Sequence, residues 1–162
     1  MRVLNVNKVY YRRAGAETAY FNLARLLEGR GHEVVPFAMQ HPQNEPTPWE
    51  KYFPSGVEFR SRGSLIEKSK RAARVIYSNE ARDRLRLLQK EARPDVAHLH
   101  NIAHQLSPSI LDALREADVP VVQTLHDYKL TCPVYTHRTG GRVCERCKGG
   151  HFYQCTIHRC NG

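Results

Sequence analysis

A strand, a glycine-bearing turn, a helix and a second strand open the chain, and this order constrains the fold most. Residues 2–10 (RVLNVNKVY) alternate valine and leucine with polar residues and contain no glycine or proline, a pattern typical of a β-strand. The next segment has helical spacing, with Tyr20, Leu23 and Leu27 on one face and a glycine stop after it. Residues 32–39 (HEVVPFAM) have the pattern of a second strand. Such a βαβ unit predicts two parallel strands.

The remaining segments continue the alternation of helices and strands. A capping box of Ser64 and Glu67 predicts a helix start, and the proline at position 94 predicts the end of the helix before it. The predicted elements are a long proline-containing loop over 40–56, a helix to about residue 77, a helix with Ala81, Leu85, Leu88 and Ala92 on one face, a strand over 95–101, a helix capped by Ser107-Pro108, and a strand over 119–128. The order predicts an α/β fold: a Rossmann-like, doubly wound, mainly parallel sheet, followed by a small C-terminal cysteine-rich module.

Polar residues and a glycine turn follow three of the predicted strands. In doubly wound sheets the ligand binds outside the carboxyl ends of the strands, so these turns are predicted to form one site. Gly15 lacks a Cβ atom and would let backbone N–H groups approach a phosphate at a helix N-terminus. His98 and His100 share one sheet face; we expect His98 to be a buried, hydrogen-bonded histidine and His100 to belong to the site. The predicted substrate-binding residues are Gly15, Ala16, Glu17, His100, Asn101 and Asp127, and His126 is the predicted catalytic residue.

The five cysteines all fall between residues 132 and 160. No secretory signal or apolar stretch long enough to span a bilayer is present, so we expect a cytoplasmic protein with reduced thiols. The odd number of cysteines also argues against a fully paired disulfide framework. The spacing C-x2-C-x7-C-x4-C suits a structural, tetrahedral zinc ion. The predicted ligands are Cys144, Cys147, Cys155 and Cys160, and Cys132, His151 or His158 could replace one of them.

The chain carries a net charge of +9, which favours an anionic partner. Residues 60–93 hold eleven lysines and arginines against four acidic residues. A zinc-ribbon protein that binds nucleic acid is therefore an alternative function. It is the less favoured one, because the basic residues lie away from the cysteines and no aromatic-basic RNA motif is present. A third hypothesis is that the chain is a nucleotide-binding Rossmann domain in its own right, although its sequence lacks the full dinucleotide fingerprint.

Four segments together carry a family resemblance: the AGAE turn, RGHEV, PDVAHLHN with LSPSIL, and PVVQTLHDYKLTCP. With them, the chain resembles the N-terminal domain of GT-B-fold glycosyltransferases of the retaining family-4 type. The similarity runs over essentially all 162 residues. The subset it resembles continues with a CxxC and two further cysteines, as CERCKGGHFYQCTIHRC does here. The first turn departs from the family pattern, which often has two adjacent glycines where this chain has Ala14 and Gly15.

The resemblance implies transfer of a sugar from a nucleotide-sugar donor to a glycan or lipid-linked acceptor, with retention and with no protein base assigned. It implies that residues 1–130 form the acceptor-side domain, that residues 131–162 form the cysteine-rich module, and that the nucleotide-sugar domain is absent. This chain alone is then expected to transfer no sugar. The resemblance implies that His126 is an active-site histidine and that the turn at Gly15 faces the donor diphosphate and the acceptor. It also implies that the basic surface over 60–93 contacts an anionic membrane at its inner face or a lipid-linked acceptor.

Overall fold

The computed structural model describes residues 1–57 and 64–160. The chain divides into two compact units, Met1–Thr124 and Leu125–Gly162, and each is described by itself.

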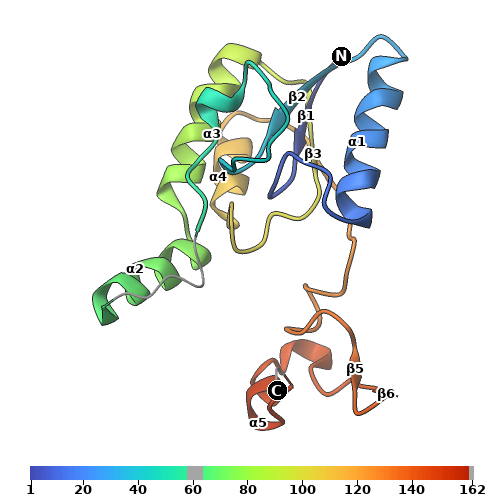
Figure 1. The fold of residues 1–162 in the computed structure, drawn as a ribbon, viewed down its shortest axis with the longest axis vertical. Helices are drawn as coiled ribbons and strands as arrows, with labels where there is room; N and C mark the ends of the chain where they lie inside the picture. Colours follow the sequence, from blue (N-terminus) through green and yellow to red (C-terminus); the bar gives the residue numbers. More distant parts are fainter. Residues whose placement is uncertain (58–63, 161–162) are drawn as a thin grey trace. The chain divides into compact units, whose positions relative to one another are not determined.

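A parallel sheet forms the centre of the first unit (Figure 1). Its strand order is β2-β1-β3-β4. Each neighbouring pair is parallel, with Val3 opposite Val34 in the β1–β2 pair and opposite Val96 in the β1–β3 pair. The strands are β1 Arg2–Val6, β2 Glu33–Phe37, β3 Val96–Leu99 and β4 Val121–Gln123. This sheet and its helices confirm the predicted α/β, Rossmann-like fold.

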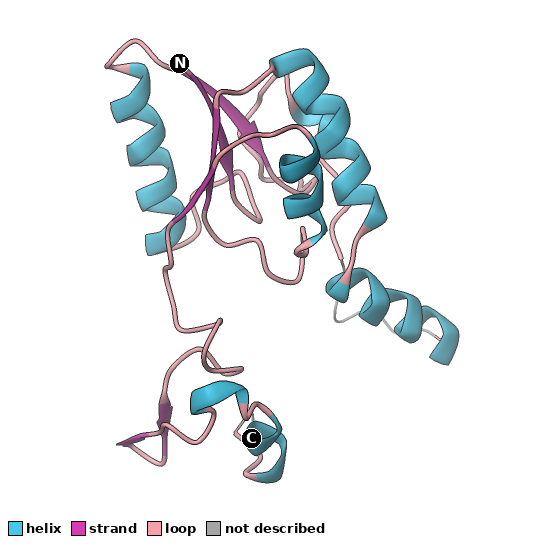
Figure 2. Ribbon diagram, turned by 180° about the vertical axis from the view of Figure 1, so that it is seen from behind, coloured by secondary structure: helices cyan, strands magenta, loops and turns pink. Residues whose placement is uncertain are grey.

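Helices cover both faces of this sheet. Figure 2 shows α1 on one face and α3 with α4 on the other, as expected of a doubly wound arrangement. The predicted apolar face of α3 is buried, since Ala81, Leu85, Leu88 and Ala92 are each at most 1% exposed. The helices of this unit are α1 Gly15–Glu28, α2 Leu65–Ile76, α3 Asn79–Ala92 and α4 Ser109–Glu116.

The predicted helix starts are close to the observed ones. The capping box before α2 is present, with the Glu67 backbone N–H donating to the Ser64 hydroxyl at 3.3 Å. Before α4, the Ser109 backbone N–H donates to the Ser107 hydroxyl at 3.3 Å, so Ser107 does serve the helix start. The helix itself begins one residue later than expected, because Pro108 occupies the N-cap position.

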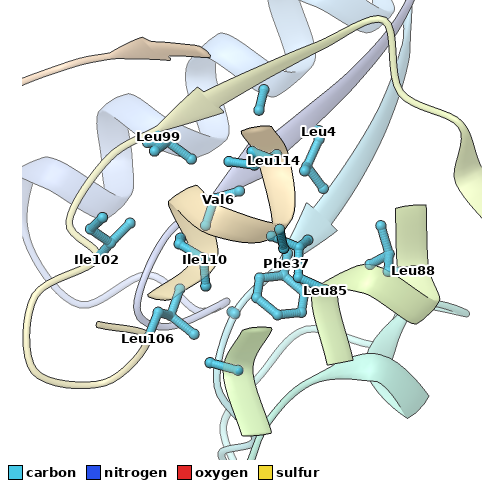
Figure 3. Close-up of a cluster of buried hydrophobic side chains, with 14 of the residues drawn as sticks. Leu4, Val6, Phe37, Leu85, Leu88, Leu99, Ile102, Leu106, Ile110 and Leu114 are labelled. Atoms are coloured by element: carbon cyan, nitrogen blue, oxygen red, sulfur yellow. The ribbon is translucent and has the colours of Figure 1, made fainter. Parts of the chain in front are cut away.

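The hydrophobic core lies between the sheet and the α3–α4 layer. Figure 3 shows strand residues such as Leu4 and Phe37 facing Leu85 and Leu88 of α3 and Leu114 of α4. The loop over 40–56 was predicted to have no regular element, yet it contains a 3-10 turn, Glu50–Tyr52. That turn precedes a fully buried phenylalanine at position 53, which fixes the loop on the core.

The last strand is much shorter than predicted. We expected a buried strand over 119–128, but β4 ends at Gln123, and Val121 and Val122 are 44% and 56% exposed. The prediction is wrong beyond Thr124, whose backbone N–H still donates to the carbonyl of Leu99 at 2.9 Å. Because β3 ends at Leu99, later residues have no strand on that side to pair with.

The second unit contains little regular structure. Its elements are the antiparallel pair β5 Arg138–Thr139 and β6 Arg142–Val143, a 3-10 turn Lys148–Gly150, and a short helix α5 Tyr153–Ile157. Among the described residues of the whole chain, no helix combines the length and the apolar character needed to cross a membrane.

Candidate functional site

The strands are all parallel, but the side of β1 on which the chain adds its next strand changes after β2, so the switch point lies between β1 and β3. After β1 the chain moves to β2 on one side, and after β2 it crosses to β3 and β4 on the other. The crevice beyond the carboxyl ends of two such strands is the usual ligand site of open α/β sheets. Two loops meet there and are tied together by hydrogen bonds. The Lys8 N–H donates to the carbonyl of Asn101 at 2.8 Å, and the Asn101 N–H donates to Asn7 Oδ1 at 3.3 Å.

A polar cluster lies beneath these loops. His100 Nε2 is 3.1 Å from Asn5 Oδ1, and the Tyr20 hydroxyl donates to the Asn5 carbonyl at 3.1 Å. The ring centroids of Tyr20 and His100 are 5.2 Å apart, and those of His98 and His100 are 4.5 Å apart. Burial raises the pKa of Tyr20 well above its usual range, so its hydroxyl keeps its proton and acts as a donor.

His98 was predicted to be a buried histidine, but it is the less buried of the two. The two rings do share one face of the sheet, but His100 is only 3% exposed, whereas His98 is half-buried. The reason is tertiary: Tyr20 of α1 packs against His100, while the His98 ring contacts the Thr124 hydroxyl at 2.7 Å next to the exposed β4. His100 therefore lies in the interior beside Asn5, and its role in substrate binding stays a prediction.

The first turn of α1 places Gly15, Ala16 and Glu17 together. Glu17 is 2% exposed, and its Oε2 atom accepts from the Ala14 N–H at 3.1 Å, which caps the helix. A Cβ atom added to Gly15 would meet no other atom within 4 Å. The space beside Gly15 is thus open, which is compatible with the predicted approach of a phosphate.

Two buried polar atoms near this turn and on β1 lack protein partners. Within the described part of the chain, Glu17 Oε1 and Asn5 Nδ2 are enclosed yet form no hydrogen bond. Unpaired buried polar atoms are rare and costly, about 1–3 kcal/mol each, so each needs an explanation. Sequence reasoning identified Glu17 but missed Asn5 and Tyr20. The available signal was the asparagine at position 5, a polar residue between Leu4 and Val6 in a strand that parallel pairing buries.

His126 and Asp127 were predicted at the end of the fourth strand, and that placement is wrong. They follow β4 by several residues and belong to the second unit. Asp127 is exposed, and its Oδ1 atom accepts from the Lys129 N–H at 2.9 Å, which is a local turn bond. His126 is half-buried. The catalytic role of His126 and the binding role of Asp127 stay predictions.

The cysteines of the second unit are free thiols that line a common cavity. Loss of solvation raises the pKa of Cys147 and of Cys155, while a hydrogen bond from the backbone of Arg146 lowers the pKa of Cys144. Among the residues that the structure describes, no group of three or more cysteine, histidine or acidic side chains is placed so that it could hold a metal ion. The predicted zinc ligands therefore stay a prediction.

Comparison with models of known protein families gives a match. The sequence profile of the family described as Glycosyltransferase Family 4 matches residues 13–147. The matched region begins just before the first turn of α1 and extends through the CxxC at positions 144 and 147. No curated protein matches the chain.

Proposed function

The chain belongs to Glycosyltransferase Family 4, and from this premise we propose that it forms the acceptor-side half of a retaining sugar transferase. The enzyme would pass a sugar from a nucleotide-sugar donor to a glycan or lipid-linked acceptor. The observation that carries this proposal is two buried, unpartnered polar atoms: Glu17 Oε1 in the first turn of α1 and Asn5 Nδ2 near the carboxyl end of β1.

The chemistry of this pair suits a sugar. A carboxylate oxygen accepts a hydrogen bond from a hydroxyl group, and an amide N–H donates to one, so the two atoms complement a polyhydroxylated ligand. His100 holds the Asn5 side chain, and Tyr20 donates to the Asn5 backbone carbonyl. The Asn5 side chain therefore loses little conformational freedom when a ligand binds. The open N-terminus of α1 at Gly15 offers N–H groups and a favourable dipole to a phosphate of the donor. Positioning and charge stabilisation, with His126 as the predicted contributor, would supply the catalysis.

A binding experiment on the 162-residue chain tests the proposal. The labelled chain is applied to a glycan array, and the glycans it retains are titrated by NMR against wild type and Glu17→Gln. Glutamine keeps an oxygen for the Ala14 N–H but puts an NH2 donor where the Oε1 acceptor stood. Loss of a charged hydrogen bond of about 1.5–3 kcal/mol predicts binding roughly 10- to 100-fold weaker. Glu28→Gln, at the exposed far end of the same helix, is the matched control and should bind as wild type.

The same chain is then incubated with UDP-glucose and with GDP-mannose. We expect no sugar transfer, because the donor half of the proposed enzyme lies outside these residues. Turnover of either donor by the chain alone would contradict the proposal that this chain forms only the acceptor-side half of the enzyme. Retention of no glycan by the array, or equal affinities of wild type and Glu17→Gln, would contradict the acceptor-side assignment.

We also propose that α2 contacts an anionic membrane surface. Ile66, Ala73 and Ile76 recur at helical spacing, and the two isoleucines are 68% and 73% exposed. Lysines at positions 68 and 70 are exposed on the same helix, and Figure 1 shows α2 extending away from the sheet of its unit. An exposed helix with an apolar stripe and basic flanks is typical of an interfacial helix.

Vesicle co-sedimentation tests this contact. Wild type should bind phosphatidylcholine vesicles that contain phosphatidylglycerol, bind pure phosphatidylcholine weakly, and lose binding as salt rises. Ile76→Glu should abolish most of the binding. Leu26→Glu, at a leucine that is 62% exposed on α1, is the matched control and should bind as wild type. Equal binding of both variants would exclude α2 as the contact.

A further inference from the structure

The buried residues of the second unit are cysteines rather than aliphatic or aromatic residues. Within residues 125–160, the buried side chains are Cys132, Cys147 and Cys155, which are 6–8% exposed. The large apolar side chains of this unit are exposed instead, namely Leu125, Tyr128, Leu130, Tyr135, Val143, Phe152, Tyr153 and Ile157. A unit this small has too little apolar burial to hold its fold without a disulfide, a metal ion or another partner.

The five thiols of the chain converge on one place in this unit. They line a single small cavity, together with a few polar side chains such as His137. None of the five forms a disulfide. Thiols that are buried together without a covalent link are the arrangement that a thiophilic cation stabilises.

We propose that this cavity binds one zinc ion through four of its five thiolates, and that the ion replaces an apolar core in the second unit. Four thiolates give zinc its preferred tetrahedral shell, with each sulfur about 2.3 Å from the ion. Binding requires the thiol side chains to rotate toward a common centre, and each coordinating thiol releases its proton to solvent. The proposal does not depend on sugar transfer.

The backbone around the cavity is already arranged for such a site. The CxxC pair ends at Cys147, whose carbonyl accepts from the Gly150 N–H at 3.2 Å, and the chain then reverses. The reversal uses Gly149 and Gly150, whose φ angles of 74° and 87° favour glycine. The short helix α5 follows, and the Cys160 N–H donates to the carbonyl of Cys155 at 3.0 Å, which brings these two residues together. The chain thus returns its last two cysteines to the cavity that its first three line.

The number of thiols makes a specific prediction, because tetrahedral zinc uses four and the cavity offers five. The chain is purified without chelator, and its zinc content is measured by elemental analysis. We expect one zinc per chain. Five single Cys→Ser variants are then titrated with zinc in competition with a chromogenic chelator. Four should bind zinc at least tenfold more weakly than wild type, and one should bind it normally, which identifies the spare thiol.

Two further histidine variants, and two measurements on the wild-type chain, distinguish loss of a zinc ligand from misfolding of a cysteine variant. His151→Gln and His158→Gln change exposed side chains near the cysteines and should retain zinc, since the proposed shell is all sulfur. In the wild-type chain, substitution of zinc by cobalt should give the intense visible bands of a tetrahedral thiolate site. A mercurial reagent should release one zinc ion as it consumes the thiols.

Several results would overturn the proposal. These are a chain that neither carries zinc after purification nor takes it up on titration, loss of zinc in either histidine variant, and normal zinc affinity in all five cysteine variants. Iron in place of zinc, with the absorption of an iron–sulfur cluster, would also overturn it.

Discussion

Replacement of Leu85 by alanine tests whether the α3 face holds the first unit together. Leu85 is fully buried, and Figure 3 shows it near Phe37 within the core cluster. Leu→Ala at a fully buried site costs about 3 kcal/mol, within a range of roughly 2–5, because apolar contact is lost and a cavity remains. For a chain of this size, that loss corresponds to a melting temperature lower by about 6–12 °C.

The assay is urea unfolding followed by the fluorescence of Trp49, the single tryptophan of the chain, which packs against the same core. Leu87→Ala is the matched control, because Leu87 lies on the same helix and is 49% exposed. The helix-propensity change is the same at both positions, so the difference between the variants isolates burial. Leu87→Ala should change the free energy of unfolding by no more than about 0.5 kcal/mol. Similar losses in the two variants would show that burial of the α3 face does not stabilise the first unit.

Three further predictions concern hydrogen bonding, backbone strain and charge. Tyr20→Phe removes the buried donor to the Asn5 carbonyl and should lower the free energy of unfolding by about 1 kcal/mol in the same urea assay; an unchanged midpoint would exclude this bond as a contributor. Arg93→Gly should raise the free energy of unfolding by up to about 1 kcal/mol, because Arg93 ends α3 with a φ of 47° that glycine adopts without strain; a lower midpoint would contradict this. Hydrogen bonds from Arg86 lower the pKa of Glu116 below 4.5, so this pair adds stability that is fully present above pH 4.5 and is lost as the pH falls through the lowered value. Glu116→Gln should slightly reduce the melting temperature at pH 7 and flatten its decline in acid; a parallel decline in both proteins would count against the pair.

The sequence predicted the order and type of the main elements because each leaves a local pattern. The α3 face is an example: Ala81, Leu85, Leu88 and Ala92 recur at helical spacing, and all four are buried. Parallel pairing of β1 and β2 followed from their connection through a helix. The first turn of α1 was likewise predictable, since a strand followed by a glycine turn and a helix places Gly15 and Glu17 at the sheet edge.

The candidate site was predicted only in part, because its geometry depends on which elements pack together. The strand over 119–128 was predicted from its composition, yet β4 stops at Gln123, because strand length depends on the partner strand. His126 and Asp127 consequently belong to the second unit rather than to the end of a strand. Asn5 was missed because nothing local indicates that Tyr20 and His100 surround it.

Local patterns along the chain specify which residues can form each element and where the cysteines are concentrated. These properties follow from spacing, turn chemistry and composition, all of which are local along the chain. Which side chains are buried around Asn5 and in the second unit depends on the tertiary structure. Packing encloses His100 against Tyr20 and leaves His98 half-buried, and in the second unit it buries Cys132, Cys147 and Cys155 while the large apolar side chains stay exposed. Burial depends on neighbours that are distant in sequence, and that distance is why no local pattern predicted it.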